Sequence, residues 1–445
     1  MKCVSRTGSR SSGINFFRKT LATVVGAAVL CSVSTTFAGD AVLPQGARLA
    51  IVGDSITEQK LYSKFIETYL LACAGRNDMH AMQFGWSGET AGGFAARLAN
   101  DLAAFKPTVA TTCYGMNDGG YRPFDNSVGA PYEKNMRDVL AKFAAIGVKT
   151  VVVGSPGAVD TKYYTKPLNW GDKTPADGYN ASLKSLRDID EKLAKEFSMP
   201  FADVHTALID AMAKAKAALG ADYAVCGRDG VHPGLNGQLV MAYAFLKALG
   251  CDGAVGEIVV DMASKSATAN EGHKVVTTTP EKIEIVSSRY PFCFQGDAKT
   301  SGGTRSILPY LPFNKDLNRL VLKVKGLPSE TALVAWGTEK KEFAREKLEQ
   351  GINLAAEFEK TPFDDQFNKV MQAVADKQAF ETGMIKQVIT NFRWLNQQFK
   401  DDAQAKTAMD ALRATLEKRW TQLDDVAHAV VVPVRHTLSV TPALK

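Results

Sequence analysis

The stretch Arg48-Leu49-Ala50-Ile51-Val52-Gly53-Asp54-Ser55-Ile56-Thr57 decides the fold of the first half of the chain. Its apolar part is short and ends at a glycine, which predicts a buried strand over residues 48–52. An amphipathic pattern over residues 61–74 predicts a helix soon after it. The stretch therefore predicts a strand, a turn and a helix, with Ser55 at the turn.

The same alternation of short apolar strands and amphipathic helices continues to about residue 249. It predicts stacked βα units on a parallel sheet, an α/β fold. Strands are expected at residues 82–86, 108–114, 150–153 and 201–204, and helices at 90–105, 179–197 and 235–249. We predict that residues 39–260 form this α/β domain.

A second region is expected beyond residue 260. Residues 261–279 are rich in Ser, Ala, Thr, Lys and Asn without apolar periodicity, which predicts a linker or exposed loop. Residues 280–445 are predicted to be an accessory region whose strands carry a helical insert at about 361–426. The strands are expected at 282–287, 320–324 and 332–336, with a final strand pair at 429–440 broken at Pro433.

The helical insert has apolar residues at the i, i+3, i+4 spacing of a buried stripe. They are Met384, Ile385, Val388, Ile389, Phe392, Leu395 and Phe399, followed by Leu412, Leu416, Trp420 and Leu423. This predicts a helical hairpin that packs on itself and on the accessory strands. A groove for a partner protein is the alternative.

The first 38 residues resemble an export signal. They carry Lys2, Arg6, Arg10, Arg18 and Lys19 but no acid, then an apolar run from residue 21 to 33 and a small residue before Gly39. A membrane anchor is the alternative, but the run is shorter than the ~20 residues of a spanning helix. We predict a cleaved signal peptide over residues 1–38 and a periplasmic or extracellular protein; Leu30 before Cys31 argues against lipoprotein processing.

Removal of this segment would lower the formal charge from +6 to about +1. A nearly neutral protein without a basic, aromatic stripe argues against nucleic acid as a partner, and no later apolar run is long enough for stable membrane insertion. The expected partner is a small-molecule or glycan ester, and the oligomeric state stays open.

Five cysteines would remain, Cys73, Cys113, Cys226, Cys251 and Cys293, and none of them forms a C-x-x-C pair. Export permits disulfides, although an odd number leaves one thiol without a partner in the chain. Without C-x-x-C or H-E-x-x-H, a metal site has little support, and no cofactor is expected.

Ser55 is placed at the carboxyl end of a strand, where open α/β sheets bind their ligands. It is either a nucleophile that needs a base or only the N-cap of the next helix. Asp229-Gly230-Val231-His232 supplies a base in a glycine-rich loop, because an aspartate can hold one ring nitrogen while the other faces the serine. A surface turn is the alternative for this segment.

Two further loops contain groups that stabilise negative charge. Gly88 follows the second strand, and Asn117 lies in Gly115-Met116-Asn117-Asp118 after the third. A backbone N–H at Gly88 and the Asn117 amide are oxyanion-hole candidates, although both residue types are also common in turns.

Together these four short motifs, in this order, resemble the SGNH/GDSL hydrolases. The resemblance implies a flavodoxin-like three-layer α/β/α domain over about residues 46–252. It also implies a catalytic triad of Ser55, Asp229 and His232, with an oxyanion hole formed by Ser55, Gly88 and Asn117. One departure is Gln83-Phe84-Gly85, where many members have Asn-x-Gly.

Four other residues are not expected to take part in catalysis. Ser87 lies in Gly-x-Ser-Gly, but Glu89 occupies the position where a nucleophile elbow needs glycine, so Ser87 is expected only to shape its loop. His205 is expected to be structural or helix-capping, and His436 to pack in a strand. Cys226 could brace the triad loop through a disulfide, but it lacks a base.

The combined prediction is a secreted serine esterase that removes O-acetyl groups from carbohydrate. A lipid or aryl esterase, or a thioesterase, is the alternative enzyme. A carbohydrate-binding or scaffold protein with a vestigial hydrolase domain is the alternative of another class.

Overall fold

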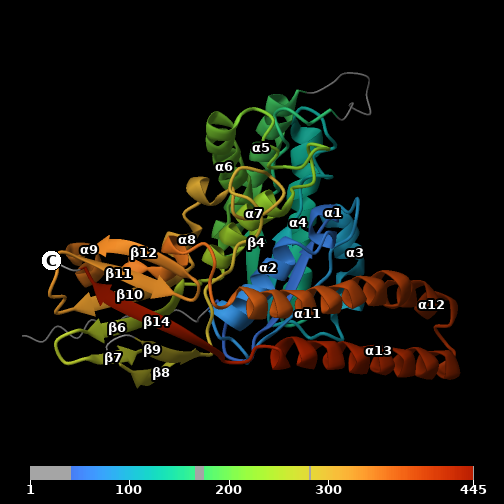
Figure 1. Cartoon of the computed structure of the whole chain (residues 1–445). Helices are drawn as coiled ribbons and strands as arrows, with labels where there is room; N and C mark the ends of the chain where they lie inside the picture. The colour runs from blue at the N-terminus through green and yellow to red at the C-terminus, as the bar shows by residue number, and fades with distance from the viewer. Residues whose placement is uncertain (1–41, 166–174, 280–281, 444–445) are drawn as a thin grey trace, which may run out of the picture. The chain divides into compact units, whose positions relative to one another are not determined.

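Five parallel strands form the sheet that positions the candidate site (Figure 1). The computed structural model describes residues 42–165, 175–279 and 282–443, so the predicted signal peptide lies outside the described residues. The strands are β1 (Arg48–Gly53), β2 (His80–Gln83), β3 (Val109–Cys113), β4 (Thr150–Gly154) and β5 (Phe201–Ala202). Their order is β2-β1-β3-β4-β5, the flavodoxin-like order, which confirms the predicted fold class.

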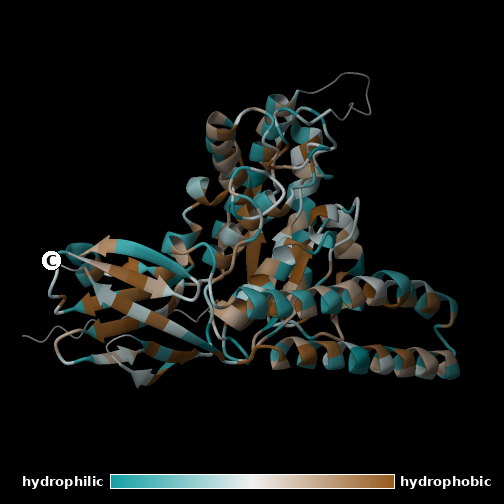
Figure 2. Ribbon diagram, in the orientation of Figure 1, coloured by the Kyte–Doolittle hydropathy of each residue, from teal (hydrophilic) through white to brown (hydrophobic). Residues whose placement is uncertain are grey.

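Helices cover both faces of this sheet. They are α1 (Ser55–Glu58), α2 (Tyr62–Thr68) with a π-turn at Tyr69–Cys73, α3 (Ala91–Leu102), α4 (Asn126–Ala145), α5 (Ala176–Glu196), α6 (Val204–Leu219) and α7 (Leu235–Ala248). Leu49 and Ile51 of β1 pack in one core with Phe65 of α2, whereas Ala50 and Val52 pack in another with Phe94 of α3. Alternate residues of β1 therefore serve opposite layers, and Figure 2 shows hydrophobic segments in the strands between these layers.

The predicted linker at residues 261–279 is wrong. Three strands run through this part of the chain, namely β6 (Ala254–Asp261), β7 (Ser266–Ala269) and β8 (His273–Thr278). β7 and β8 are edge strands, so much of their polar sequence faces solvent and the chain needs no continuous apolar run there. Because β6 pairs with a strand of the accessory region, that region begins before residue 260.

Two sheets make up the accessory region, in the orders β13-β10-β6-β7 and β12-β11-β14-β9-β8. Their remaining strands are β9 (Ile283–Ser287), β10 (Arg319–Lys325), β11 (Thr331–Trp336), β12 (Glu339–Ala344), β13 (Ile352–Asn353) and β14 (Val434–Pro442). Short helices lie between them at Leu308–Tyr310, α8 (Phe313–Asp316), α9 (Arg345–Gln350) and α10 (Leu354–Glu357). The predicted final strand pair is wrong: Pro433, which cannot donate a ladder hydrogen bond, directly precedes a single strand β14.

A helical hairpin is spliced between β13 and β14. It consists of α11 (Asp364–Gly383), a π-turn at Met384–Val388, a 3-10 turn at Ile389–Asn391, α12 (Phe392–Gln398) and α13 (Ala403–Ala429). The hairpin itself confirms the prediction, and Figure 1 shows α11 and α13 side by side.

The docking of the hairpin on the accessory strands is confirmed only at its N-terminal end, where Phe363 contacts Trp336 of β11 and His436 of β14. Farther along, α11 contacts β2 and α2 of the α/β domain, which was not predicted. Met384, Ile385, Ile389 and Phe392 are buried in the same core as one face of the parallel sheet. Phe399 is 44% exposed, so the predicted stripe ends before the tip of the hairpin.

Buried charges also fix the hairpin to the α/β domain. The Lys377 ammonium of α11 lies 2.6 Å from a Glu67 carboxylate oxygen of α2 and 3.2 Å from an oxygen of Asp424 on α13. Ser63 of α2 donates a 2.8 Å hydrogen bond to Gln378 of α11. Loss of one partner would leave a buried charge unpaired, so these contacts stabilise the hairpin in this position.

Candidate active site

Ser55 is the first residue of α1 and follows β1 directly. The N-cap of this helix is Asp54, whose Oδ1 accepts a 2.9 Å hydrogen bond from the Ile56 N–H. The alternative that Ser55 serves as the N-cap is therefore wrong. Its hydroxyl is available for another partner.

That partner is His232. Ser55 Oγ lies 2.8 Å from His232 Nε2, and His232 Nδ1 lies 2.5 Å from Asp229 Oδ2. The backbone N–H groups of His232 and Val231 donate to Asp229 Oδ1 at 2.9 and 3.0 Å. The structure thus brings together the three predicted triad residues, with the aspartate held by its own turn.

The charge of Asp229 sets the tautomer of His232. Partial burial raises the pKa of Asp229, but hydrogen bonds from the His232 and Val231 amides outweigh it and lower the pKa below its ordinary value. An ionised carboxylate accepts the proton of Nδ1, so Nε2 is left as the acceptor for the serine O–H.

A glutamine outside the predicted motifs joins the serine helix to the histidine loop. Gln238 of α7 accepts a hydrogen bond from the Tyr62 N–H at 3.1 Å, and its Nε2 donates to Gln59 Oε1 at 2.6 Å and to the Pro233 carbonyl at 3.4 Å. Pro233 follows His232 directly. Gln238 therefore sets the separation of Ser55 and His232, and no sequence pattern marks such a long-range contact.

The Gly88 turn supplies the first oxyanion candidate. Gly88 has φ +75°, a left-handed conformation that side chains disfavour, and Glu89 N–H closes the turn on the Trp86 carbonyl at 3.1 Å. Gly88 itself is exposed. Its amide is thus presented by a tight turn at the carboxyl end of β2.

Asn117 supplies the second candidate, and hydrogen bonds to both its side-chain oxygen and its side-chain nitrogen fix the orientation of its amide. Tyr121 O–H donates to Asn117 Oδ1 at 3.0 Å, while Asn117 Nδ2 donates to the Glu89 carbonyl at 3.0 Å. Tyr121 also stacks on Tyr179, with ring centroids 5.2 Å apart. Tyr121, which no sequence motif marks, fixes Asn117 with its N–H₂ group toward the Gly88 turn.

We predict that Asn117→Ala lowers kcat for ester hydrolysis by roughly 10²- to 10³-fold with little change in KM, because an oxyanion donor acts mainly in the transition state. Steady-state kinetics on an acetyl ester measure this effect. Asn391→Ala, at an exposed position of the hairpin, is the matched control. A kcat for Asn117→Ala equal to that of the wild type would remove Asn117 from the oxyanion hole.

Two buried carboxyl groups lie behind the site. Burial is the main cause that raises the pKa of Asp54 to about 7, and the nearby Asp118 and Glu89 raise it further. Burial also raises the pKa of Asp118 to about 6, although hydrogen bonds from the Ala91 and Gly115 amides oppose it.

The turn before Asn117 requires glycine at position 115, because its φ is +112° and a Cβ would lie 2.9 Å from Pro156.

A pH-dependent stability follows from Asp54. The unfolded carboxyl titrates at about 3.8 and the folded one at about 7, so the folded state binds more protons between these values and stability falls as pH rises through them. Asp54→Asn keeps the cap and does not titrate. Its free energy of unfolding relative to wild type should therefore rise by on the order of 2–4 kcal/mol from about pH 4 to about pH 8.

Urea unfolding at several pH values measures this difference. Asp125, the exposed N-cap of α4, is the matched control, because hydrogen bonds from Ser127 lower its pKa. Asp125→Asn should lack the rising trend. A flat difference for Asp54→Asn would show that folding does not raise the pKa of Asp54.

The departure at Gln83 has a structural reason. Gln83 Oε1 accepts a 3.0 Å hydrogen bond from the Gly85 N–H, and its Nε2 donates to Thr382 Oγ1 of the hairpin at 2.5 Å. The Gln83 side chain, longer than that of asparagine, therefore stabilises the turn after β2 and also binds the hairpin.

The four residues that are not expected to take part in catalysis have structural roles. Ser87 donates its N–H and O–H to Glu58, His205 Nδ1 contacts the Gly157 carbonyl at 2.8 Å, and buried His436 contacts Ser287 Oγ at 2.8 Å. Cys226 is a buried free thiol, as are Cys73, Cys113 and Cys293, and Cys251 is free as well. The proposed disulfide brace at Cys226 is thus wrong.

Among the described residues, His80, Asp424 and His428 form the one group that could hold a metal ion. However, His428 contacts the Asp424 carbonyl through Nδ1 and the Met79 carbonyl through Nε2, at 2.8 and 2.9 Å. Asp424 contacts His80 through one oxygen and Lys377 through the other. The ligand atoms are committed to hydrogen bonds that dock α13, so the group is better explained as a structural network.

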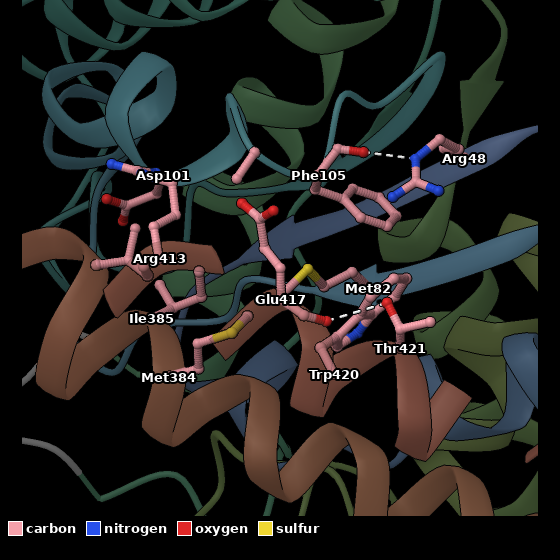
Figure 3. Close-up of a pocket in the computed structure, with 12 residues that line it drawn as sticks. Arg48, Met82, Asp101, Phe105, Met384, Ile385, Arg413, Glu417, Trp420 and Thr421 are labelled. Atoms are coloured by element: carbon pink, nitrogen blue, oxygen red, sulfur yellow. Dashed lines mark hydrogen bonds between the residues drawn. The ribbon is translucent and has the colours of Figure 1, made fainter. Parts of the chain in front are cut away.

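A cavity of about 110 Å³ lies between the hairpin and the α/β domain (Figure 3). Apolar residues such as Phe105 and Trp420 line it, with Arg48, Arg413 and Glu417 around them. Arg48 begins β1, whereas Ser55 follows its end, so this cavity is separate from the triad. A second hollow, of about 310 Å³, is lined by Trp86, Ser87 and Gly88 together with Arg393 of α12.

In the described part of the chain, no helix combines the length and the apolar character needed to cross a membrane.

Comparison with known proteins assigns part of the chain to a family. Residues 51–240 match the model of the GDSL-like Lipase/Acylhydrolase family, whereas no curated protein is significantly similar to the chain. The solved structure of a gut microbial diltiazem-metabolizing enzyme is similar with a TM-score of 0.70 and 22% identity, covering 91% of this chain and 100% of that chain. This likeness shows a shared fold that includes the accessory region.

Shorter structures match less well. A catalytic mutant of an acetylxylan esterase from Geobacillus stearothermophilus is 21% identical, with a TM-score of 0.37, and covers 46% of this chain and 95% of that chain. An alpha/beta hydrolase enzyme from the metagenome of Lake Arreo, Spain, is 24% identical, with a TM-score of 0.37, and covers 47% of this chain and 98% of that chain. The match to the family model assigns residues 51–240 to the GDSL-like lipase/acylhydrolase family, which is a family of carboxylic ester hydrolases.

Proposed function

We propose that this protein is an exported serine esterase that removes O-acetyl groups from carbohydrate through an acyl-enzyme on Ser55. The observation that carries the proposal is the 2.8 Å contact of Ser55 Oγ with His232 Nε2, whose ring is held by Asp229. A serine hydroxyl is a weak nucleophile until such a base accepts its proton.

The reaction proceeds in two halves. Ser55 Oγ attacks the ester carbonyl and passes its proton to His232 Nε2, and the Ser55 N–H, Gly88 N–H and Asn117 amide stabilise the oxyanion. His232 then protonates the leaving sugar oxygen, which departs and leaves the acetyl group on Ser55. Water, deprotonated by His232, attacks this acyl group, and acetate leaves as the proton returns to Ser55.

The proposed substrate class is supported by the surroundings of Gly88. The hollow beside it is lined by polar and charged side chains, with Thr90, Arg97 and Arg393 among them, rather than by a long apolar channel. A short acyl group on a polar alcohol suits this lining better than a long fatty chain. The predicted export and near-neutral charge agree with a glycan outside the cytoplasm.

The test is a panel of acetylated glycans with released acetate measured, alongside acetyl, octanoyl and palmitoyl esters of one chromogenic alcohol. We expect acetate release from at least one glycan and turnover that falls with acyl length. A strong preference for the palmitoyl ester would contradict the carbohydrate proposal and favour a lipid esterase. N-terminal sequencing of exported protein tests the signal peptide, with Gly39 expected as the first residue.

A further inference from the structure

The helical hairpin reaches the candidate site through one lysine. Lys386 lies in the π-turn Met384–Val388, where Met384 and Ile385 are buried against the α/β domain. Its ammonium lies 2.7 Å from Glu58 Oε1 and 4.9 Å from the centroid of the Trp86 ring. The two charged side chains are only 21% and 18% exposed, so this ion pair is largely shielded from water.

Glu58 continues this contact to the Gly88 turn. Its other oxygen, Oε2, accepts the Ser87 N–H at 2.5 Å and the Ser87 O–H at 2.6 Å. Partial burial raises the pKa of Glu58, but the hydrogen bonds from Lys386 and Ser87 outweigh it and lower the pKa below its ordinary value. The carboxylate is therefore ionised at neutral pH and accepts from both sides.

The two residues that flank Gly88 are thus held by different anchors. Glu89 is fixed by the buried guanidinium of Arg97, at 2.6 Å, within the α/β domain. Ser87 is exposed and is fixed through Glu58, the last residue of the helix that Ser55 begins. The direction of the Gly88 N–H depends on both anchors, because the peptide plane of a glycine turns easily when one flank is released.

We propose that Lys386 is a positioning residue of the active site: it holds Glu58, which holds Ser87 and so aims the Gly88 N–H at the oxyanion. The hairpin then contributes to the geometry of the active site through Lys386. This inference rests on the proposed function, since it assigns Gly88 to an oxyanion hole. Loss of the contact should lower kcat rather than raise KM, because the donor acts in the transition state.

The test compares Lys386→Met, Lys386→Arg, Glu58→Gln and the double variant Lys386→Met/Glu58→Gln. For Lys386→Met and Glu58→Gln we expect kcat on an acetyl ester to fall roughly 10- to 100-fold with KM within about twofold. Lys386→Arg should restore most of the rate. The double variant should be no slower than the worse single variant, because residues that act as one unit are not additive.

The matched control is Lys406→Met, which removes an exposed ion pair with Asp410 on α13 of the same hairpin. It should leave kcat unchanged. A Lys386→Met variant with the kcat of the wild type, or with a rate loss that adds fully to that of Glu58→Gln, would overturn the proposal.

A second measurement does not depend on catalysis. Amide hydrogen exchange of residues 86–90 should quicken by more than about tenfold in Lys386→Met and Glu58→Gln, while the amides of β1 keep their protection. Unchanged exchange at residues 86–90 would overturn the coupling even in an inactive protein. If the wild type hydrolyses no ester but exchange quickens as expected, the proposed function fails and the contact stands.

Discussion

Ser55→Ala is expected to lower kcat for acetyl-ester hydrolysis by roughly 10⁵- to 10⁶-fold, leaving only the rate that bound substrate and oxyanion donors provide. The serine oxygen is the atom that attacks the carbonyl, and alanine offers none in its place. Released acetate, measured with an excess of enzyme, quantifies the residual rate. Substrate binding should change little, since the hydroxyl is a small part of the contact surface.

Folding must be shown to be intact for this result to count. Asp54, not Ser55, is the N-cap of α1. Loss of the Ser55 hydroxyl should therefore leave the melting temperature nearly unchanged. Ser185→Ala, at a partly exposed position of α5, is the matched control and should keep full activity. A folded Ser55→Ala variant that hydrolyses acetyl esters as fast as wild type would exclude Ser55 as nucleophile.

His232→Ala is expected to cost nearly as much as Ser55→Ala, because a serine without its base is not activated. Asp229→Asn should cost less, roughly 10⁴-fold, since the amide presents the wrong partner to Nδ1 and disfavours the productive tautomer. The same acetyl-ester kinetics give both values. The ranking itself is a test, because it follows from the order of contacts Ser55, His232 and Asp229.

Combining the changes tests whether the residues act together. A Ser55→Ala/His232→Ala double variant should be about as slow as either single variant, because both lose the same step. Losses that multiply would mean that His232 acts on something other than Ser55. His232 is in a surface loop with its side chain 28% exposed, so His232→Ala should fold normally.

The parallel sheet and the triad were predictable because their signals are local. A buried parallel strand reads as a short apolar run, as in β1, and the turn that follows carries Ser55. In the segment from Asp229 to His232, two backbone amides donate to the Asp229 carboxylate and close the turn. The geometry of this turn therefore depends on four adjacent residues. Such features need no knowledge of distant partners.

Other features depend on contacts far apart in the sequence and could not be predicted. Gln238 and Tyr121 hold the site through partners that only the fold brings near. The hairpin presented one apolar stripe, and a stripe does not say which surface will cover it. Edge strands such as β7 and β8 bury little, so their polar composition is that of a loop.

The contact of the hairpin with Glu58 shows why the missed docking matters. Had the hairpin packed on the accessory strands, Lys386 would be remote from the serine helix. Because the hairpin docks on the α/β domain, the ammonium of Lys386 lies beside the carboxylate of Glu58, three positions after Ser55. Under this proposal, the accessory region influences a site whose catalytic groups all lie in the α/β domain.

Covalent capture of the nucleophile tests the central claim most directly. The purified chain is treated with an organophosphonate that reacts with activated serines, then digested, and the modified residue is identified by tandem mass spectrometry. We expect one phosphonyl group on Ser55, a much slower labelling reaction in His232→Ala and no label in Ser55→Ala. Label on Ser87 or another residue, or an active enzyme that takes up none, would contradict it.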